Sequence, residues 1–264
     1  MYRIPKFLKP KVTSDLIRIG SSNDGGYVIP KNAAVDTDTL ISFGLYDDWK
    51  FEEDFKKFKN CKVICYDHSV TTKFWIIRFI KNCYSILLMN NIVDNFKKFF
   101  TYFEYLIFFN KKDVLHLKKF IAPKNEFTFG INNKDKTDLN EIFSKNLYEN
   151  IFLKIDIEGS EYRILDQIIL HQNKIKGAVI EFHSCDLHFE RIEKFISNFD
   201  LELTHIHVNN YSNINQSSNP DVIELTFCQK KYSKKSKVEN LNYPIKDLDS
   251  PNNKKEEDPQ VSFY

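Results

Sequence analysis

Cysteine, glycine and proline are scarce in this 264-residue chain, which holds five Cys, seven Gly and eight Pro. The cysteines are odd in number and form no C-x-x-C pair, a pattern that excludes a disulfide framework and a zinc ribbon. Reduced thiols are typical of the cytoplasm, so the cysteines favour a cytoplasmic protein.

The chain also lacks long apolar runs and an excess of one charge. No stretch approaches the ~18 uninterrupted apolar residues of a membrane span, and the N-terminal MYRIPKFLKP is charged where a signal peptide would be apolar. The 38 basic and 36 acidic side chains leave a net charge of +2, which excludes the strong positive field that binds nucleic acid. We therefore expect a cytoplasmic chain with no transmembrane segment and no nucleic-acid partner.

A hydrophobic content of 42% is enough for one globular domain over residues 1–264. Short apolar runs alternate with segments of helical periodicity, which predicts an α/β fold with a doubly wound, mostly parallel sheet. The last two runs have no helix between them and predict an antiparallel pair at one edge. The seven predicted strands are residues 39–43, 62–66, 127–129, 151–155, 178–182, 203–208 and 222–227.

Two segments depart from this alternation. Residues 71–120 are dense in Phe, Tyr, Ile and Lys, and we interpret them as an inserted helical segment. Such a segment would pack on the sheet, pair two subunits into a homodimer, or contact the inner membrane surface. Residues 230–264 are polar and contain three prolines, which predicts an irregular C-terminal extension.

The turn after the first predicted strand, FGLYDDWKFEEDF, has one glycine, Gly44, in place of the G-x-G-x-x-G pattern of dinucleotide-binding folds. Asp47 and Asp48 would repel a pyrophosphate, which disfavours a nicotinamide cofactor. S-adenosylmethionine has no phosphate and carries a sulfonium cation, so acidic groups near this turn are compatible with its binding. Asp67 ends the next strand, 23 positions after Gly44, where its carboxylate can accept hydrogen bonds from ribose hydroxyls.

A second glycine-containing turn lies upstream, in RIGSSNDGGYVIP. This pattern is typical of an ordinary hairpin turn, which needs no function. Gly25 and Gly26 also allow a ligand to approach the backbone closely, and Asp24 could bind an ammonium group, so we expect these three residues to contact the cofactor.

The strand in LKIDIEGSEYRIL ends at Asp156, and the carboxyl ends of parallel strands face the ligand crevice. We expect Asp156 and Glu158 to lie there, with Asp156 functional and, like Gly44, in contact with the cofactor. Glu161 fits a structural role, because acids in a first helical turn complement the helix dipole.

The next two strand ends are also polar, AVIEFHS and THIHVNNYS. Together with Asp156 they would form a polar floor that a purely structural sheet does not need. The predicted members of this floor are Glu181, His183, His205, His207, Asn209, Asn210 and Tyr211.

These motifs resemble the FkbM-type S-adenosylmethionine-dependent methyltransferases. The likeness rests on LKIDIEGSEYRIL, supported by NDGGYVI, by Gly44 with Asp67 and by KTDLNEIF, and it spans residues 18–227. It implies a Rossmann-like seven-stranded domain that transfers a methyl group, usually to a hydroxyl. HVNNY and LDSPNN resemble a bacterial surface-polysaccharide branch, which implies capsule biosynthesis and a sugar, nucleotide-sugar or polysaccharide acceptor. The glycine-poor first turn and the insertion depart from the family pattern.

Transfer to a sugar hydroxyl requires removal of its proton. His183 is the first candidate for the general base, with His207 second and Asp156 beside them. Alternatively, Asp156, Glu181 and His183 would hold Mg²⁺ or Mn²⁺ and activate the hydroxyl. We expect Glu158, Glu181, Asn209, Asn210 and Tyr211 to bind the acceptor and the insertion to cover it.

Two other function classes remain open from the sequence. One is a nicotinamide-dependent sugar oxidoreductase, which the missing glycine pattern disfavours. The other is a non-catalytic glycan-binding protein on the same fold.

Overall fold

The computed structural model describes residues 1–87, 92–145, 148–212, 218–235 and 241–264. Its centre is a seven-stranded sheet in the order β12-β13-β11-β10-β5-β6-β7. Within this sheet β13 runs antiparallel to the other six strands, which are parallel to one another. The strands are β5 (Thr39–Phe43), β6 (Lys62–Tyr66), β7 (Val114–Leu117), β10 (Ile151–Ile155), β11 (Ile175–His183), β12 (Glu202–Val208) and β13 (Val222–Cys228). This arrangement confirms the predicted mostly parallel sheet and its antiparallel closing pair.

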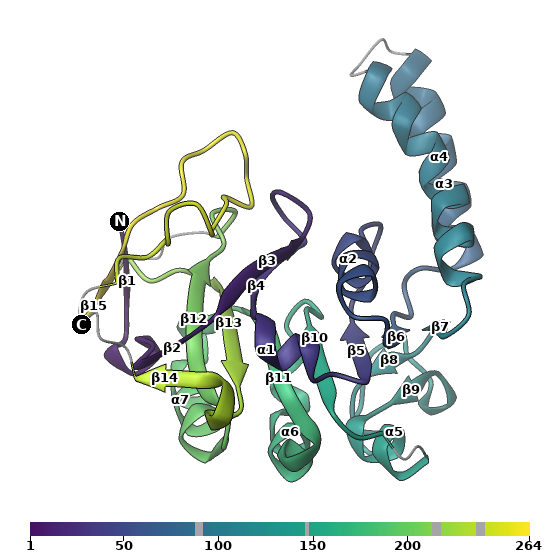
Figure 1. Cartoon of the computed structure of the whole chain (residues 1–264). Helices are drawn as coiled ribbons and strands as arrows, with labels where there is room; N and C mark the ends of the chain where they lie inside the picture. The colour runs from purple at the N-terminus through teal and green to yellow at the C-terminus, as the bar shows by residue number, and fades with distance from the viewer. Residues whose placement is uncertain (88–91, 146–147, 213–217, 236–240) are drawn as a thin grey trace.

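Helices cover both faces of the sheet, which makes it doubly wound (Figure 1). On one face, apolar side chains of α5 (Leu139–Lys145), α6 (Leu165–Leu170) and α7 (Phe189–Asn198) pack in one core. On the other face, α1 (Lys31–Val35) and α2 (Lys50–Phe58) pack in a second core. The central strands β5 and β10 are buried along their whole length, which explains why their sequences are apolar without alternation.

One predicted strand is wrong. Residues 127–129 are not in a strand, and Phe127 and Phe129 are 84% and 90% exposed. The seventh strand is β7, which lies inside the segment predicted as a helical insertion and pairs with β6 through Val114. Because β7 already occupies that edge of the sheet, residues 127–129 have no neighbouring strand there.

Short paired strands surround the sheet. The hairpin of β3 (Leu16–Gly20) and β4 (Gly26–Pro30) carries the NDGG turn. The C-terminal segment returns to the N-terminus, because β15 (Val261–Phe263) pairs with β1 (Tyr2–Ile4) and β14 (Ser233–Lys235) pairs with β2 (Val12–Ser14). A further pair joins β8 (Phe120–Ile121) and β9 (Lys136–Thr137).

Two long helices, α3 (Thr72–Leu87) and α4 (Ile92–Phe109), form a hairpin that projects from the rest of the molecule (Figure 1). It begins directly after β6, at the edge of the sheet away from β12 and β13. None of the helices in the described part of the chain combines the length and the apolar character needed to cross a bilayer.

Candidate active site

A cavity of about 690 Å³ opens at the carboxyl ends of β5, β6 and β10. This volume is within the ordinary range for small-molecule sites. The loops that follow these three strands supply most of its wall, and the NDGG turn supplies Asp24 and Gly25. The lining residues are 24–25, 44–48, 51–52, 66–69, 101, 119–121, 154, 156–158 and 160. The predicted cofactor residues Asp24, Gly25, Gly44, Asp67 and Asp156 therefore line one cavity.

Asp67 fixes the loop after β5. Its Oδ2 accepts hydrogen bonds from the backbone N–H groups of Leu45 and Tyr46, each at 2.9 Å. Its Oδ1 accepts from the backbone N–H and the hydroxyl of Ser69, each at 2.7 Å. Although burial raises the pKa of Asp67, these hydrogen bonds outweigh burial and lower it. A ribose bound to this carboxylate would share its oxygens with these donors.

Gly44 lies where the loops after β5 and β10 meet. Its φ is +86°, and a Cβ there would lie 1.8 Å from the carbonyl oxygen of Asp156. The Lys154 ammonium joins the same loops, because it donates to the Gly44 carbonyl at 2.8 Å and to Asp156 Oδ2 at 3.3 Å. The single glycine of this turn is therefore required by close backbone packing.

Glu52, on α2, lines the same cavity and was not singled out from the sequence. Its Oε1 accepts a hydrogen bond from the Ser42 hydroxyl, and its buried Oε2 has no hydrogen-bond partner in the described structure. Burial raises the pKa of this carboxyl group. The available signal was its position between Phe51 and Phe55, which places an acid on the buried face of an amphipathic helix.

A smaller cavity of about 250 Å³ adjoins the first and shares Asp24, Asp156 and Glu158 with it. The ends of β11, β12 and β13 supply the rest of its lining. Those further residues are Glu181, His183, Asn209, Tyr211, Asp221 and Val222. Five predicted acceptor or base residues thus meet in one place: Glu158, Glu181, His183, Asn209 and Tyr211.

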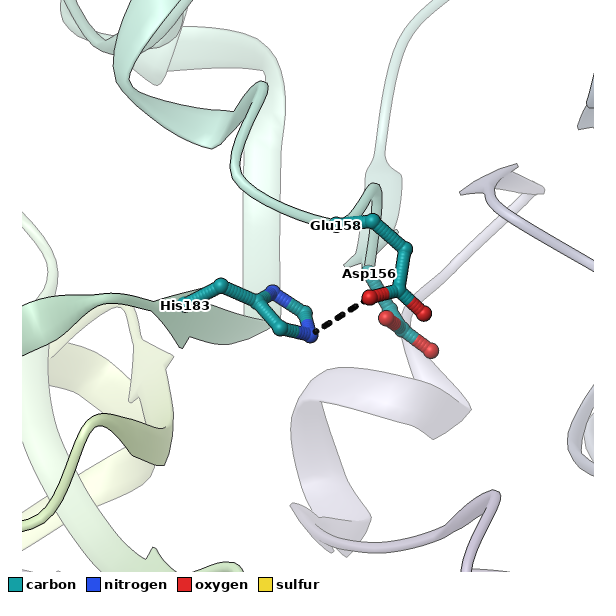
Figure 2. A group of neighbouring side chains, drawn as sticks. All are labelled: Asp156, Glu158 and His183. Carbon is teal, nitrogen blue, oxygen red and sulfur yellow. Dashed lines mark ion pairs between the residues drawn. The ribbon is translucent and has the colours of Figure 1, made fainter. Parts of the chain in front are cut away.

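His183 is held by two acids on opposite sides of its ring. Nδ1 lies 3.0 Å from Oε1 of the buried Glu161, and Nε2 lies 3.4 Å from Oε2 of the exposed Glu158 (Figure 2). Although burial of the imidazole lowers the pKa of His183, the hydrogen bond and charge of Glu161 outweigh burial and raise it to about 9. Glu161 therefore positions the candidate base, whereas the sequence predicted only that this acid complements a helix dipole.

Glu181 is buried in a network with Tyr27. The Tyr27 hydroxyl lies 2.9 Å from Glu181 Oε2 and 3.0 Å from Asp156 Oδ2, while Asn209 donates to Glu181 Oε1 at 3.0 Å. Burial, followed by the charge of Asp156, raises the pKa of Glu181 well above its ordinary value. The single hydroxyl hydrogen of Tyr27 cannot be donated to both Glu181 and Asp156. A protonated Glu181 supplies the second hydrogen that these two contacts need.

His207, the second candidate base, lies elsewhere. Its buried ring contacts Glu224 Oε2 through Nδ1 at 3.3 Å and Asp258 Oδ2 through Nε2 at 2.9 Å. His207 does not line either of the two described cavities. His205 contacts Asp249 in the same way. These histidines attach the C-terminal segment to β12.

Two other predicted residues also lie outside the cavities. Asn210 donates to the Asn253 carbonyl at 3.1 Å and accepts from the Asn253 N–H at 2.6 Å, so it too holds the C-terminal segment. Gly26 lies in β4, where a Cβ would meet the Ser21 carbonyl oxygen at 1.8 Å. Neither residue lines either of the two described cavities.

The oxygen and nitrogen donors of Asp156, Glu158 and His183 lie within 4.8 Å of one another (Figure 2). This set could bind a hard divalent cation, with Glu158 in the place predicted for Glu181. His183 would have to use Nε2, because Nδ1 faces Glu161.

The inserted hairpin does not cover the smaller cavity, contrary to expectation. The residues that line that cavity come from the β3–β4 turn and from the strand ends around β10 to β13. Of these two cavities the hairpin reaches the larger, through Thr101. The reason is strand order, because the hairpin leaves the sheet after β6, on the other side of β5 and β10 from β11.

Comparison with known proteins adds a family match. None of the curated proteins matches the sequence. Among solved structures, a precorrin-6y C5,15-methyltransferase from Geobacter metallireducens GS-15 shares 12% identity at a TM-score of 0.35, over 76% of this chain and 86% of that one. A protein from Pyrococcus horikoshii proposed to be an RNA methyltransferase shares 10% identity at a TM-score of 0.35, over 74% of each chain. Residues 101–212 match the family model described as the methyltransferase FkbM domain, so this part of the chain is similar to the family that the sequence resembles.

Proposed function

We propose that this protein is an S-adenosylmethionine-dependent O-methyltransferase that acts on a sugar hydroxyl during surface (capsular) polysaccharide biosynthesis. The observation that carries the proposal is the pair of adjoining cavities. The larger suits a cofactor, the smaller holds a positioned histidine, and Asp24, Asp156 and Glu158 line both. The polysaccharide setting follows from the resemblance of HVNNY and LDSPNN to that branch of the family.

The charge of the larger cavity favours a cationic cofactor. Its lining contains seven acidic side chains and two lysines. A pyrophosphate would be repelled there, whereas a sulfonium and an ammonium group are attracted, which supports S-adenosylmethionine over a nicotinamide dinucleotide. The cofactor supplies the methyl group as an electrophile. Asp67 offers carboxylate oxygens to ribose hydroxyls, and the unpaired Oε2 of Glu52 offers an acceptor to the ammonium group.

The smaller cavity suits a polyhydroxylated acceptor. Carboxylates, an amide and a phenol line it, and these groups accept and donate hydrogen bonds with sugar hydroxyls. Asp156 and Glu158 lie on the boundary between the cavities, where they can orient the acceptor hydroxyl toward the cofactor.

His183 takes the proton of the acceptor hydroxyl at Nε2. Glu161 accepts the hydrogen bond from Nδ1, which fixes the tautomer whose Nε2 is unprotonated and stabilises the imidazolium that forms. Only the neutral ring can act as the base. Its raised pKa therefore limits the active fraction at neutral pH and makes it a stronger base once neutral.

Isothermal titration calorimetry with S-adenosylmethionine, S-adenosylhomocysteine and NADH tests the cofactor. We expect both adenosyl compounds to bind and NADH not to bind. Methyl transfer from labelled S-adenosylmethionine to nucleotide sugars and to polysaccharide, with and without chelator, then tests the reaction. Binding of NADH alone would favour the oxidoreductase. Binding of glycans without cofactor or turnover would favour the glycan-binding protein.

A further inference from the structure

The α3–α4 hairpin carries its apolar side chains on the outside. On α3, Ile76, Ile80 and Tyr84 are 55%, 59% and 64% exposed. Their spacing of four residues places them on one stripe of the helix. Surface helices ordinarily expose polar side chains, so an exposed stripe of apolar side chains is the reverse of the usual pattern.

The opposite side of α3 already has partners in the molecule. Trp75 is buried against the rings of Trp49 and Tyr105, and Arg78 pairs with Asp47 in the loop after β5. The side of α3 that packs on the body is therefore a different side from the exposed stripe. The exposed stripe is a second apolar face, directed away from the body.

The other helix of the hairpin has the same character. Phe103, Leu106 and Ile107 of α4 are 61%, 44% and 67% exposed. Each follows another at a spacing of one, three or four residues, so they form one apolar surface on α4. Both helices thus present large apolar side chains to solvent, on a structure that projects from the domain (Figure 1).

Positive charge is concentrated in the same segment. Residues 72–109, which span the hairpin, contain five basic and two acidic side chains, a net charge of +3, while the whole chain carries +2. The rest of the chain is therefore net negative. Within α3 there are three basic residues and no acid, and Lys73 and Lys81 are exposed beside the apolar stripe.

We propose that the α3–α4 hairpin binds the surface of an anionic lipid bilayer. Exposed aliphatic and aromatic side chains flanked by lysines are the pattern of an interfacial amphipathic helix, which buries its apolar face at the headgroup boundary. Charge complementarity selects lipid over a second copy of this chain, because two hairpins of +3 would repel each other. The Arg78–Asp47 ion pair would keep the larger cavity beside the bound surface.

Vesicle flotation with the full chain tests this proposal. The probes are vesicles of phosphatidylglycerol and phosphatidylcholine in equal parts, and vesicles of phosphatidylcholine alone. We expect flotation with the anionic vesicles, falling as salt is raised. Ile80→Ser with Phe103→Ser should weaken binding at least about tenfold, and Lys73→Ala with Lys81→Ala should weaken it about 25-fold at low salt.

Leu170→Ser with Leu187→Ser is the matched control, because these leucines are 67% and 77% exposed and lie outside the hairpin. It should float as the unmodified chain does. All altered residues are exposed, and thermal melting of each variant verifies that it is folded. No flotation with anionic vesicles, or flotation that survives the Ile80 and Phe103 changes, would overturn the proposal. Self-association lost in that double variant, seen by ultracentrifugation without vesicle binding, would instead assign the face to a second copy.

Discussion

The Nδ1 atom of His183 lies 3.0 Å from Oε1 of Glu161, a carboxylate whose side chain is fully buried. The same oxygen accepts hydrogen bonds from the backbone N–H groups of Ile157 and Gly159, at 3.1 and 3.2 Å. The loop after β10 therefore fixes the acid, and the acid fixes the ring. This relationship predicts a titration that a solvent-exposed histidine would not show.

We expect the imidazole of His183 to titrate near pH 9 in the unliganded protein, as followed by NMR. The Glu161→Gln change keeps the shape of the side chain but removes its charge, so the pKa should fall toward or below the ordinary value of about 6.5. Asp156, Glu158 and Glu181 remain as the other acids that face the ring. An unchanged pKa in Glu161→Gln would show that Glu161 does not position the base electrostatically.

The same pair predicts a pH-dependent rate. Because only neutral His183 accepts the proton, kcat/KM for the acceptor should rise about tenfold per pH unit below the pKa of His183. Glu161→Gln should move this acidic limb to lower pH and lower the plateau, because the ring becomes a weaker base. A rate profile that does not move with the NMR pKa would separate His183 from the proton transfer.

Glu52 and Asp67 should each contribute to cofactor affinity. Glu52→Gln removes the charge facing the proposed ammonium group, and Asp67→Ala removes the ribose acceptor, so each should weaken S-adenosylmethionine binding by about 1–3 kcal/mol. Calorimetry measures this effect. Asp67→Ala also removes the hydrogen bonds that hold the loops after β5 and β6, so Ser69→Ala serves as a partial control, since it removes one of these bonds, in the loop after β6, and keeps the carboxylate. Equal losses in Asp67→Ala and Ser69→Ala would assign to Asp67 a role in holding the loops and none in binding the ribose.

Gly44 and Gly159 form a matched pair for stability. Both have positive φ, +86° and +91°, but an added Cβ at Gly44 would meet the Asp156 carbonyl at 1.8 Å, while that at Gly159 meets nothing within 4 Å. Gly159→Ala should cost about 1–2 kcal/mol of unfolding free energy from backbone strain alone. Gly44→Ala should cost several-fold more, measured by urea unfolding. Similar costs would refute the close packing of the loops after β5 and β10.

The His207–Asp258 contact should make attachment of the C-terminal segment depend on pH. Although burial lowers the pKa of His207, the charge of Glu224 and the hydrogen bond to Asp258 outweigh burial and raise it well above its ordinary value. A raised histidine pKa stabilises the fold fully below the unfolded pKa of about 6.5 and loses this effect as pH rises through the folded pKa.

Asp258→Asn should therefore lower the melting temperature at neutral pH, with a free-energy cost of about 1–3 kcal/mol. The difference from the unmodified chain should shrink at alkaline pH, where His207 is neutral in both. Melting curves across pH measure it. A constant difference would show that the contact does not depend on the charge of His207.

Much of the fold could be predicted from the sequence, because the parallel strands contain short, mostly apolar runs and the central strands β5 and β10 are buried along their whole length. The meeting of Asp156, Glu181 and His183 also followed, since parallel strands bring their carboxyl ends to one edge. Strand order could not be predicted. β13 lies between β11 and β12, which separates His207 from His183, and β7 takes the edge that residues 127–129 were expected to form.

Side-chain roles that depend on local backbone geometry were also not predictable. Glu161 follows Glu158 and Gly159, both with positive φ, so the chain turns back and directs this acid to the histidine. A first-turn acid of a regular helix would face solvent. The place of Glu52 in the site likewise depends on the packing of α2 against the larger cavity, which the sequence does not show.

The proposed role of His183 is tested by methyl transfer in the presence of chelator. Transfer of a labelled methyl group from S-adenosylmethionine to a sugar acceptor is measured for the unmodified chain and for His183→Ala. We expect transfer by the unmodified chain and a loss of ~10²–10⁴-fold in His183→Ala, with calorimetric binding of the cofactor unchanged. Loss of activity in chelator with recovery in Mg²⁺ would favour a cation at Asp156, Glu158 and His183 instead. Full activity in His183→Ala would show that His183 is not the general base.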